Sequence, residues 1–439
     1  MGSAPAWQVD PTVSPAAAKA AADYLRQAVL DAGSGPEWPS QAFPLRLESV
    51  GVVGAGVMGS GIAISFLNAG IPVVLLDRSP QALASGVARV REALQSSRRK
   101  GRLMAPDVEQ MMALLRPTME WGDLAAADWV VEAVFENLDL KRNVMAALGK
   151  TCKPGAVLAS NTSSLDIDDL ARASGRPQDV VGMLFLVPAN VQPLIEVVRG
   201  AASSDYALFV ARQVAIRVRH IPVQSRVGFG FIGTRMVASM LREADFLLLD
   251  GATPQQIDGA MEGFGFAMGP CRSLDLIGLD TACQVLAERE KALAPNDHPA
   301  YRLPTKMLHA MGRLGQKSGQ GYYTYEGRQP LPDATVMRVV ADIASTHGIR
   351  RRRSIADSEI VGRCVLSLVN EAWRLLQEGI AHRQSDIDLI WAYGYGFPRS
   401  RGGPMYYAAS QGAAAVRREM AAIARRSGDH YGYWTANAA

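Results

Sequence analysis

Residues 51–63 read GVVGAGVMGSGIA, and this stretch decides the fold of the first half of the chain. Gly54, Gly56 and Gly59 follow a short β-branched run and precede a helical pattern that continues to residue 69. In such a turn the first glycine permits the tight bend, the second lets the backbone approach a pyrophosphate, and the third allows close packing of helix and strand. The N-terminus of the following helix attracts the anion. The stretch therefore predicts a dinucleotide-binding turn.

An acidic residue after the next apolar run supports this interpretation. Asp77 ends the strand predicted at 72–77, where a carboxylate accepts hydrogen bonds from the adenosine ribose and favours NAD over NADP. Arg78 offers a cation for a 2′-phosphate, but the neighbouring carboxylate would repel that group. We expect NAD as the cofactor, with Val57 and Met58 completing the turn that holds it. A glycine-rich turn without a ligand is the alternative.

Short apolar runs alternate with helical patterns through this region. They predict, in order, strand 49–53, a helix ending at 69, strand 72–77, helix 80–99, strand 129–134, helix 138–152 and strand 156–159. Strands that alternate with helices are connected by right-handed crossovers and form a mostly parallel sheet. The fold class is therefore an α/β Rossmann-type domain at this end of the chain.

After about residue 227 the strand patterns stop, and helical periodicity takes over with an internal repeat. Each copy has an arginine, a glutamate, a glycine, an Ile-Asp pair and a Gly-Pro pair in the same order. They lie at 235, 243, 251, 257–258 and 269–270 in one copy, and at 363, 371, 379, 387–388 and 403–404 in the other. Such self-similarity predicts a duplicated all-α C-terminal domain.

The predicted organisation has four parts. They are an N-terminal extension or linker (1–46), an NAD-binding Rossmann-type domain (47–226), a first helical domain (227–330) and a second helical domain (331–439). Residues 15–32 of the extension are rich in alanine and predict one helix, which a proline-punctuated linker follows. A glycine-rich connector with an aromatic core, residues 315–328, separates the two helical domains.

Composition excludes several classes of protein. The chain has 439 residues with 48% hydrophobic and 20% charged, which is typical of a globular protein. A net charge of +4 is too small for a protein that coats nucleic acid. Four scattered cysteines without a C-x-x-C pair predict neither disulfides nor a metal site and suit a reducing compartment. With no signal peptide and no uninterrupted apolar span expected, we predict a cytoplasmic protein that binds neither membrane nor nucleic acid.

The sequence as a whole resembles the L-3-hydroxyacyl-CoA dehydrogenase family, and in particular the dehydrogenase part of multifunctional β-oxidation enzymes. The segments that carry the resemblance are GVVGAGVMGSGIA (51–63), ADWVVEAVFENLDLK (127–141), ASNTSSL (159–165), PLIEVVRG (193–200), GQGYYTY (319–325), LVNEAWRLLQEGIA (368–381) and YGYGFPRSRGGPM (393–405). This resemblance implies an NAD-dependent oxidoreductase that acts on an acyl-CoA-type substrate in fatty acid metabolism.

Matching residues imply further site positions. Glu136 and Lys141 correspond to the positions that hold the nicotinamide ribose side of NAD, and Asn161 and Ser163 to the loop between cofactor and acyl thioester. Lys100 corresponds to a lysine that meets the CoA portion of the substrate. The alternative is structural, because both lysines fit solvated helix charges and Glu136 suits a helix start in any case.

The catalytic segment departs from the family pattern. The family reads G-x-His-Phe-Phe-Asn-Pro where residues 182–188 read GMLFLVP, so Leu184 replaces the base histidine and Val187 an asparagine. A second asparagine has become Thr234, whereas Ser163 and Glu196 are retained. Leucine and valine cannot take the hydroxyl proton, a step to which a positioned base contributes roughly 10²–10⁴-fold.

These substitutions leave three hypotheses. The chain is a dehydrogenase of the family type with weakened acid–base help, or an enzyme of altered chemistry in which Glu196, alone or with Ser163 or Thr234, replaces the histidine. The third hypothesis is a non-catalytic subunit that binds acyl-CoA or NAD. A purely structural Glu196, facing Leu184 and Val187, is the alternative to its acid–base role. His220 is the histidine nearest to the segment, and we expect it not to substitute. Because a second helical copy can replace a partner, we expect a monomer or a homodimer.

Overall fold

The structure is a computed structural model that describes residues 12–45, 47–292, 298–428 and 433–434. Residues 1–11 of the predicted extension therefore lie outside the described residues. The chain packs into two compact units. The sheet unit comprises Gln27–Phe231 and Ile380–His382, and the helical unit comprises the other described residues. The four-part division of the sequence stays a prediction.

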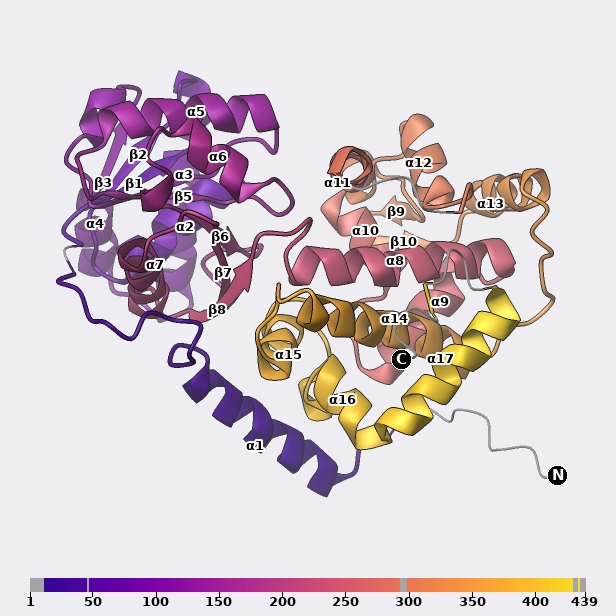
Figure 1. Ribbon diagram of the computed structural model, residues 1–439. Coiled ribbons are helices and arrows are strands. Elements are labelled where there is room, and N and C mark those ends of the chain that lie inside the picture. The colour runs from indigo at the N-terminus through magenta and orange to yellow at the C-terminus, as the bar shows by residue number, and fades with distance from the viewer. Residues whose placement is uncertain (1–11, 46, 293–297, 429–432, 435–439) are drawn as a thin grey trace. The chain divides into compact units, whose positions relative to one another are not determined.

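The sheet unit contains one eight-stranded sheet in the order β3-β2-β1-β4-β5-β6-β7-β8 (Figure 1). All neighbouring strands are parallel except β6 and β7, so the prediction of a mostly parallel sheet is confirmed. The strands are β1 (Val50–Val53), β2 (Val73–Leu76), β3 (Leu115–Thr118), β4 (Trp129–Glu132), β5 (Val157–Ser160), β6 (Val180–Phe185), β7 (Leu194–Arg199) and β8 (Ile221–Arg226).

Helices cover both faces of this sheet. Successive strand residues point to opposite faces, so neighbouring residues of one strand belong to different cores. Val130 belongs to the core on one face and Val131 to the core on the other. The Val131 face packs against α2 (Val57–Asn68), α3 (Pro80–Arg99), α4 (Ala105–Ala113) and α7 (Asp205–Arg217). The Val130 face packs against α5 (Leu138–Thr151), α6 (Ile167–Ala173) and the 3₁₀ turn Trp121–Leu124.

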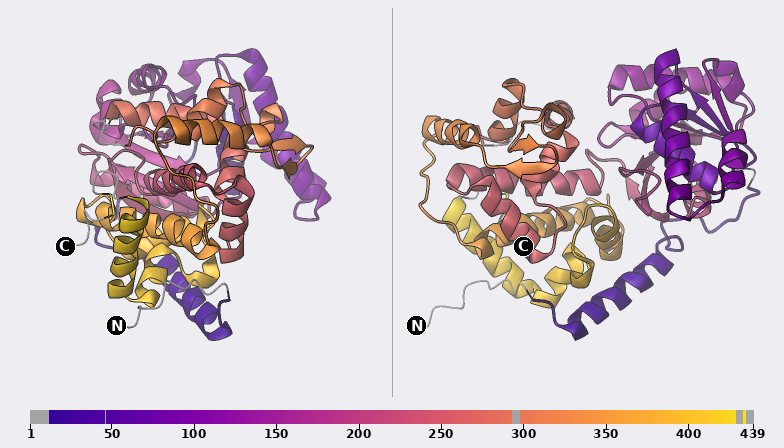
Figure 2. Two further views of the ribbon diagram at one scale, coloured as in Figure 1. Left: turned by 90° about the vertical axis from the view of Figure 1, so that its right-hand side faces the viewer. Right: turned by 180° about the vertical axis from the view of Figure 1, so that it is seen from behind.

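The two repeats of the sequence form corresponding helices of the helical unit, which are labelled in Figure 1 and drawn from two further sides in Figure 2. One copy forms α8 (Gly233–Asp250), α9 (Pro254–Phe264) and α10 (Pro270–Ile277), and the other forms α14 (Asp357–Gln377), α15 (Gln384–Tyr393) and α16 (Pro404–Gln411). The remaining helices are α11 (Leu279–Ala292), α12 (Leu303–Ala310), α13 (Ala334–Thr346) and α17 (Ala413–Ser427), together with α1 (Pro15–Asp31), which belongs to this unit up to Arg26.

Reciprocal ion pairs join the long helices α8 and α14. Arg235 of α8 lies 2.5 Å from Glu371 of α14, and Arg363 of α14 lies 2.9 Å from Glu243 of α8. Each arginine also reaches the end of the opposite helix, at Glu378 and Asp250. The repeats therefore face each other through the same residues, as the subunits of a symmetric dimer do.

One expectation about the helical part is wrong. Strands do not stop after residue 227, because β9 (Thr324–Glu326) and β10 (Gln329–Leu331) form an antiparallel hairpin within it. Gly327, at a φ of +63°, provides the left-handed conformation that its short turn requires. In the part of the chain that the structure describes, no helix is long and apolar enough to cross a membrane.

Candidate functional site

The turn between β1 and α2 contains three glycines. Two of them pack tightly against the backbone, and one borders open space. Gly54 has a φ of +100°, and a Cβ there would lie 2.7 Å from the carbonyl oxygen of Ala133. A Cβ on Gly59 would lie 1.7 Å from the carbonyl oxygen of Gly54, whereas a Cβ on Gly56 would meet no atom within 4 Å. Two glycines are thus required by packing, and the third leaves room for a ligand.

The first turn of α2 fits an anion. Gly56 occupies the N-cap position, where it provides no side-chain hydrogen bond. Val57 is exposed and Met58 half-buried, so the first residues of the helix border open space. The main-chain N–H groups of a first helical turn have no partner within the helix and carry the positive end of its dipole. This arrangement fits the pyrophosphate of a dinucleotide.

Asp77 follows β2 and lies over the glycine turn. Its Oδ2 accepts a hydrogen bond from the N–H of Ala55 at 2.8 Å, and its Oδ1 accepts one from the N–H of Ser79 at 2.9 Å. Each carboxylate oxygen has two acceptor sites, so capacity remains for ribose hydroxyls. Arg78 is exposed. The residues of the turn and Asp77 together fit the adenosine half of NAD.

A buried group of charges lies at the ends of β4 and β5. Lys141, in the first turn of α5, donates through Nζ to Oε1 and Oε2 of Glu132, both at 2.9 Å. The same Nζ lies 3.5 Å from Oε2 of Glu136 and donates to the carbonyl oxygen of Asn161 at 3.3 Å. Glu132 also accepts a hydrogen bond from the Ser160 hydroxyl.

Glu136 accepts several hydrogen bonds from the turn that follows β5. Its Oε1 accepts hydrogen bonds from Thr162 Oγ1 at 2.5 Å, from the N–H of Ser163 at 2.9 Å and from Ser164 Oγ at 3.3 Å. Asn161 connects this turn to the next strand, since its Oδ1 accepts from the N–H of Phe185 at 2.9 Å. The structure thus brings together four residues that the sequence predicted for the site: Glu136, Lys141, Asn161 and Ser163.

Leu184 and Glu196 are opposite each other in the antiparallel pair β6–β7. Directly paired residues point to the same face, so the leucine adjoins the carboxylate that the sequence singled out. Leu184 is 6% exposed and Glu196 1% exposed. Val187 lies beyond the end of β6, next to the cis peptide bond to Pro188, and is 63% exposed.

His220 is buried and lies against the backbone. Its Nδ1 lies 2.8 Å from the carbonyl oxygen of Val218, and its Nε2 lies 3.0 Å from that of Ala189. Each ring nitrogen therefore faces a main-chain carbonyl oxygen. This geometry supports the expectation that His220 does not act as the acid–base residue.

Two candidate residues lie apart from these groups. Lys100 is exposed and directly follows α3. Thr234 belongs to the helical unit, near the start of α8, where its Oγ1 lies 3.4 Å from the hydroxyl of Tyr395. Their roles stay predictions.

Sequence reasoning missed Glu132. It ends an apolar strand (Trp-Val-Val-Glu, 129–132) and was included in the strand without a role. An acid at the end of a buried parallel strand, followed by a lysine nine residues later, is the signal that could have found it.

Fold and site together define a dinucleotide-binding α/β domain followed by a duplicated helical domain. Residues 49–241 match the 3-hydroxyacyl-CoA dehydrogenase NAD-binding domain, and residues 230–325 and 360–436 match the C-terminal domain of the same family. The chain belongs to the 3-hydroxyacyl-CoA dehydrogenase family, and its cofactor class is NAD.

Relatives of known name and structure agree with this assignment. The chain is 39% identical over 399 residues to the peroxisomal bifunctional enzyme of Cavia porcellus, covering 88% of this chain and 54% of that one. It therefore spans about half the length of this curated relative. The (S)-3-hydroxybutyryl-CoA dehydrogenase of Ralstonia eutropha is 34% identical with a TM-score of 0.61, covering 64% of this chain and 100% of that one. The dehydrogenase part of multifunctional enzyme 1 from C. elegans has a TM-score of 0.65 at 25% identity and covers 99% of each chain.

Proposed function

We propose that this chain is an NAD-dependent oxidoreductase of the 3-hydroxyacyl-CoA dehydrogenase type, acting on an acyl-CoA-type substrate with an altered acid–base site. The observation that carries the proposal is the glycine turn with Asp77 on one strand end and the Glu136-bound turn 162–164 on another. Gly54, Gly56, Gly59 and Asp77 hold the adenosine side of the cofactor. When bound, NAD supplies the hydride acceptor for oxidation of a secondary alcohol.

Proton transfer is where this chain differs from its family. Oxidation of the hydroxyl requires a group that takes its proton while the hydride leaves. Leu184 cannot do so, and its cross-strand neighbour Glu196 is the carboxylate opposite it. We assign the acid–base role to Glu196, alone or through water with Ser163 or Thr234, and a substrate contact to Ser163. Lys100 is the proposed contact for the CoA portion.

The test is to follow NADH absorbance with acetoacetyl-CoA and with a series of 3-hydroxyacyl-CoA substrates. We compare the native protein with the triple variant Leu184→His/Val187→Asn/Thr234→Asn. Turnover only by the triple variant would show a diverged site on an intact scaffold. Turnover by the native protein that Glu196→Gln leaves unchanged, across a full pH profile, would overturn the role of Glu196.

A second candidate is a non-catalytic subunit that binds NAD or acyl-CoA. It is favoured by one observation, the buried leucine at the position of the family base. Calorimetric titration with NADH and with acetoacetyl-CoA separates the two candidates. Binding of both ligands without turnover of any substrate supports the second candidate, and turnover excludes it.

We propose a monomer, because the reciprocal contacts of α8 and α14 are made within one chain. Sedimentation equilibrium tests this proposal, and a stable dimer would contradict it.

The predicted cytoplasmic location is not confirmed, since a relative carries a peroxisomal name. Imaging of the full-length protein in its own cells would decide the compartment.

A further inference from the structure

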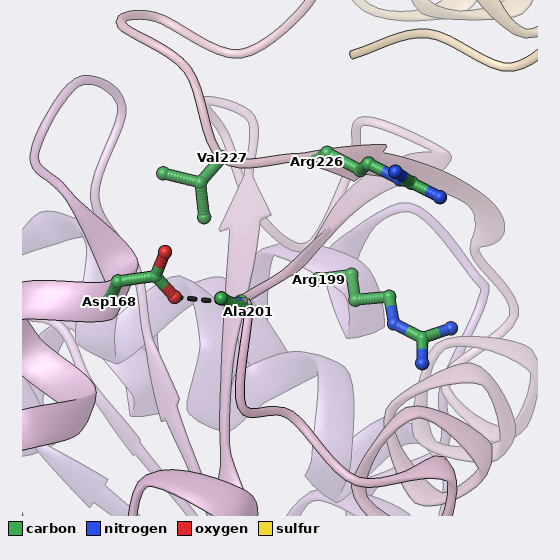
Figure 3. A pocket seen from close by; sticks show the side chains of 6 residues that line it. Asp168, Arg199, Ala201, Arg226 and Val227 are labelled. Atoms are coloured by element: carbon green, nitrogen blue, oxygen red, sulfur yellow. Dashed lines mark hydrogen bonds between the residues drawn. The ribbon is translucent and has the colours of Figure 1, made fainter. Parts of the chain in front are cut away.

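A pocket of about 450 Å³ lies in the sheet unit, apart from the groups expected to hold NAD (Figure 3). The ends of β7 and β8, the turn after β7 and the start of α6 form its walls, through Asp168, Arg199, Gly200, Ala201, Arg226 and Val227. β1, β4, β5 and β6 are parallel, whereas β7 runs antiparallel to β6 and β8 runs parallel to β7. Both strands therefore end at the edge of the sheet opposite to the glycine turn, so the pocket is separate from the dinucleotide site.

Two arginines lie side by side on one wall of this pocket. Arg199 and Arg226 are partners in the register of β7 and β8, and neighbouring strands are only about 4.8 Å apart. Figure 3 shows their side chains extending from the strand ends in the same direction. Like charges placed next to each other on a sheet destabilise it. An anion bound by both guanidinium groups offsets this repulsion, because each group presents a planar set of donors to phosphate or carboxylate oxygens.

Among the described residues, one carboxylate forms an ion pair with the two arginines. Arg199 contacts Asp205 at 3.3 Å, and the Asp205 side chain is 60% exposed. An ion pair in such an exposed position contributes little. The guanidinium group of Arg226 is exposed and has no hydrogen-bond or ion-pair partner in the part of the chain that the structure describes. This arginine is therefore free to bind a ligand.

Asp168 lies on the other side of the pocket, where the turn after β7 holds it (Figure 3). Its Oδ1 accepts a hydrogen bond from the N–H of Ala201 at 2.7 Å. The turn is closed by the Ser203 hydroxyl, which accepts from the N–H of Gly200 at 2.9 Å. Within the described residues the Oδ2 of Asp168 has no partner, so this oxygen can accept a hydrogen bond from a ligand hydroxyl.

We propose that this pocket binds a small phosphate monoester with a hydroxylated carbon skeleton, such as a sugar phosphate. A phosphate monoester carries a charge of about −1.5 to −2 at neutral pH, and Arg199 and Arg226 bind it together. A ligand hydroxyl donates to Asp168, whose negative charge disfavours a second anionic group and therefore a dicarboxylate. The volume of the pocket is in the usual range for small-molecule sites. This site does not depend on the proposed dehydrogenase reaction.

The test is calorimetric titration with ribose 5-phosphate, glucose 6-phosphate and glycerol 3-phosphate, with excess NADH present to fill the dinucleotide site. We expect at least one ester to bind with a dissociation constant of about 1 mM or less. Arg226→Gln should weaken this binding about 10-fold, as the loss of one charged hydrogen bond predicts. Arg217→Gln is the matched control and should leave the binding unchanged, because Arg217 is an exposed arginine of the same unit, in the last turn of α7.

A second variant, Asp168→Asn, distinguishes the hydroxyl end of the ligand from its phosphate end. The amide keeps one oxygen that can accept from the N–H of Ala201, but its nitrogen donates and cannot accept from a ligand hydroxyl. The variant should therefore bind the sugar phosphate more weakly than the native protein does. It should bind inorganic phosphate at least as well, because a negative charge has been removed from the pocket.

Three outcomes would overturn the proposal. The first is that none of the three esters binds to the native protein. The second is an equal loss of binding in Arg226→Gln and Arg217→Gln, which would show an effect of net charge alone. The third is displacement of the bound ester by acetoacetyl-CoA, because the pocket would then belong to the substrate site.

Discussion

At the turn after β1, one glycine is required by packing and another leaves room for a ligand. At Gly54 a Cβ would face a carbonyl oxygen at 2.7 Å with a φ of +100°. At Gly56 the φ is −68° and no atom lies within 4 Å of the added Cβ. The two glycines, two positions apart in one motif, are therefore required for different physical reasons.

We predict opposite consequences for alanine at these two positions. Gly54→Ala should lower the free energy of unfolding by about 1–3 kcal/mol, because the left-handed backbone is strained for alanine. Gly56→Ala should fold at least as stably but bind NADH more weakly, because its methyl group fills the approach to the pyrophosphate. Urea unfolding and NADH titration of both variants test this. Equal stability of the two variants would contradict it.

At the scale of elements, each helical repeat has one buried aspartate, and the two aspartates accept hydrogen bonds from the start of a helix in the same way. Asp258 accepts hydrogen bonds from the N–H groups of Cys271 and Arg272 at the start of α10, and from the hydroxyl of Tyr323 at 2.7 Å. Asp388 accepts from the N–H groups of Met405 and Tyr406 at the start of α16. The tyrosine that donates to Asp388 comes from outside the repeat. It is Tyr24 of α1, whose hydroxyl donates at 2.7 Å.

We predict that Tyr24→Phe and Tyr323→Phe each destabilise only their own repeat. Each variant removes one hydrogen bond to a buried carboxylate, worth about 1.5–3 kcal/mol. Hydrogen exchange should quicken in α15 and α16 for Tyr24→Phe, and in α9 and α10 for Tyr323→Phe. If Tyr24→Phe leaves the exchange of α16 as it is in the native protein, α1 does not complete the second repeat.

The reciprocal pairs of α8 and α14 differ in burial, and this difference makes a second prediction at the same scale. Arg363 is 3% exposed and Arg235 20% exposed at their side chains. Arg363→Met leaves Glu243 partly unpaired in the core and should cost about 3–5 kcal/mol. Arg235→Met should cost less than half of that in urea unfolding. Equal losses would show that burial does not decide the contribution of the pair.

At the scale of the whole molecule, buried aspartates make stability depend on pH. Burial raises the pKa of Asp388 to about 7 and that of Asp258 to about 6, against hydrogen bonds that lower them. Between the unfolded value near 4 and about 7, the folded state binds more protons than the unfolded chain. The contribution of these groups is therefore complete below about pH 4 and is lost as the pH rises to 7.

We predict that the free energy of unfolding falls between about pH 4 and pH 7, and that Asp388→Asn makes this fall smaller. Urea unfolding at several pH values measures both slopes, with Asp23→Asn on the exposed face of α1 as the control. A slope that Asp388→Asn leaves unchanged would show that this carboxyl group ionises as it does in the unfolded chain.

Local sequence patterns predicted the central strands and the long helices well. Helix 80–99 is found as predicted, because proline at its first position and the Ser79 cap define its start in the sequence itself. Strands β3, β6 and β7 were not singled out in advance. β6 and β7 lack a glycine-rich turn between them, and their antiparallel pairing interrupts the alternation of strand and helix on which the prediction depended.

By itself, the sequence determined the dinucleotide turn, the α/β order and the repeat, and it predicted that Leu184 stands where the resemblance implies a histidine. These are properties of short segments or of periodic spacing, and they do not depend on what packs where. Only the tertiary structure decided that Leu184 lies opposite Glu196, that Lys141 is buried between two glutamates, and that Tyr24 binds Asp388. Each of these is set by strand register or by contact between distant segments, where burial and hydrogen bonding act on residues that the sequence does not place together.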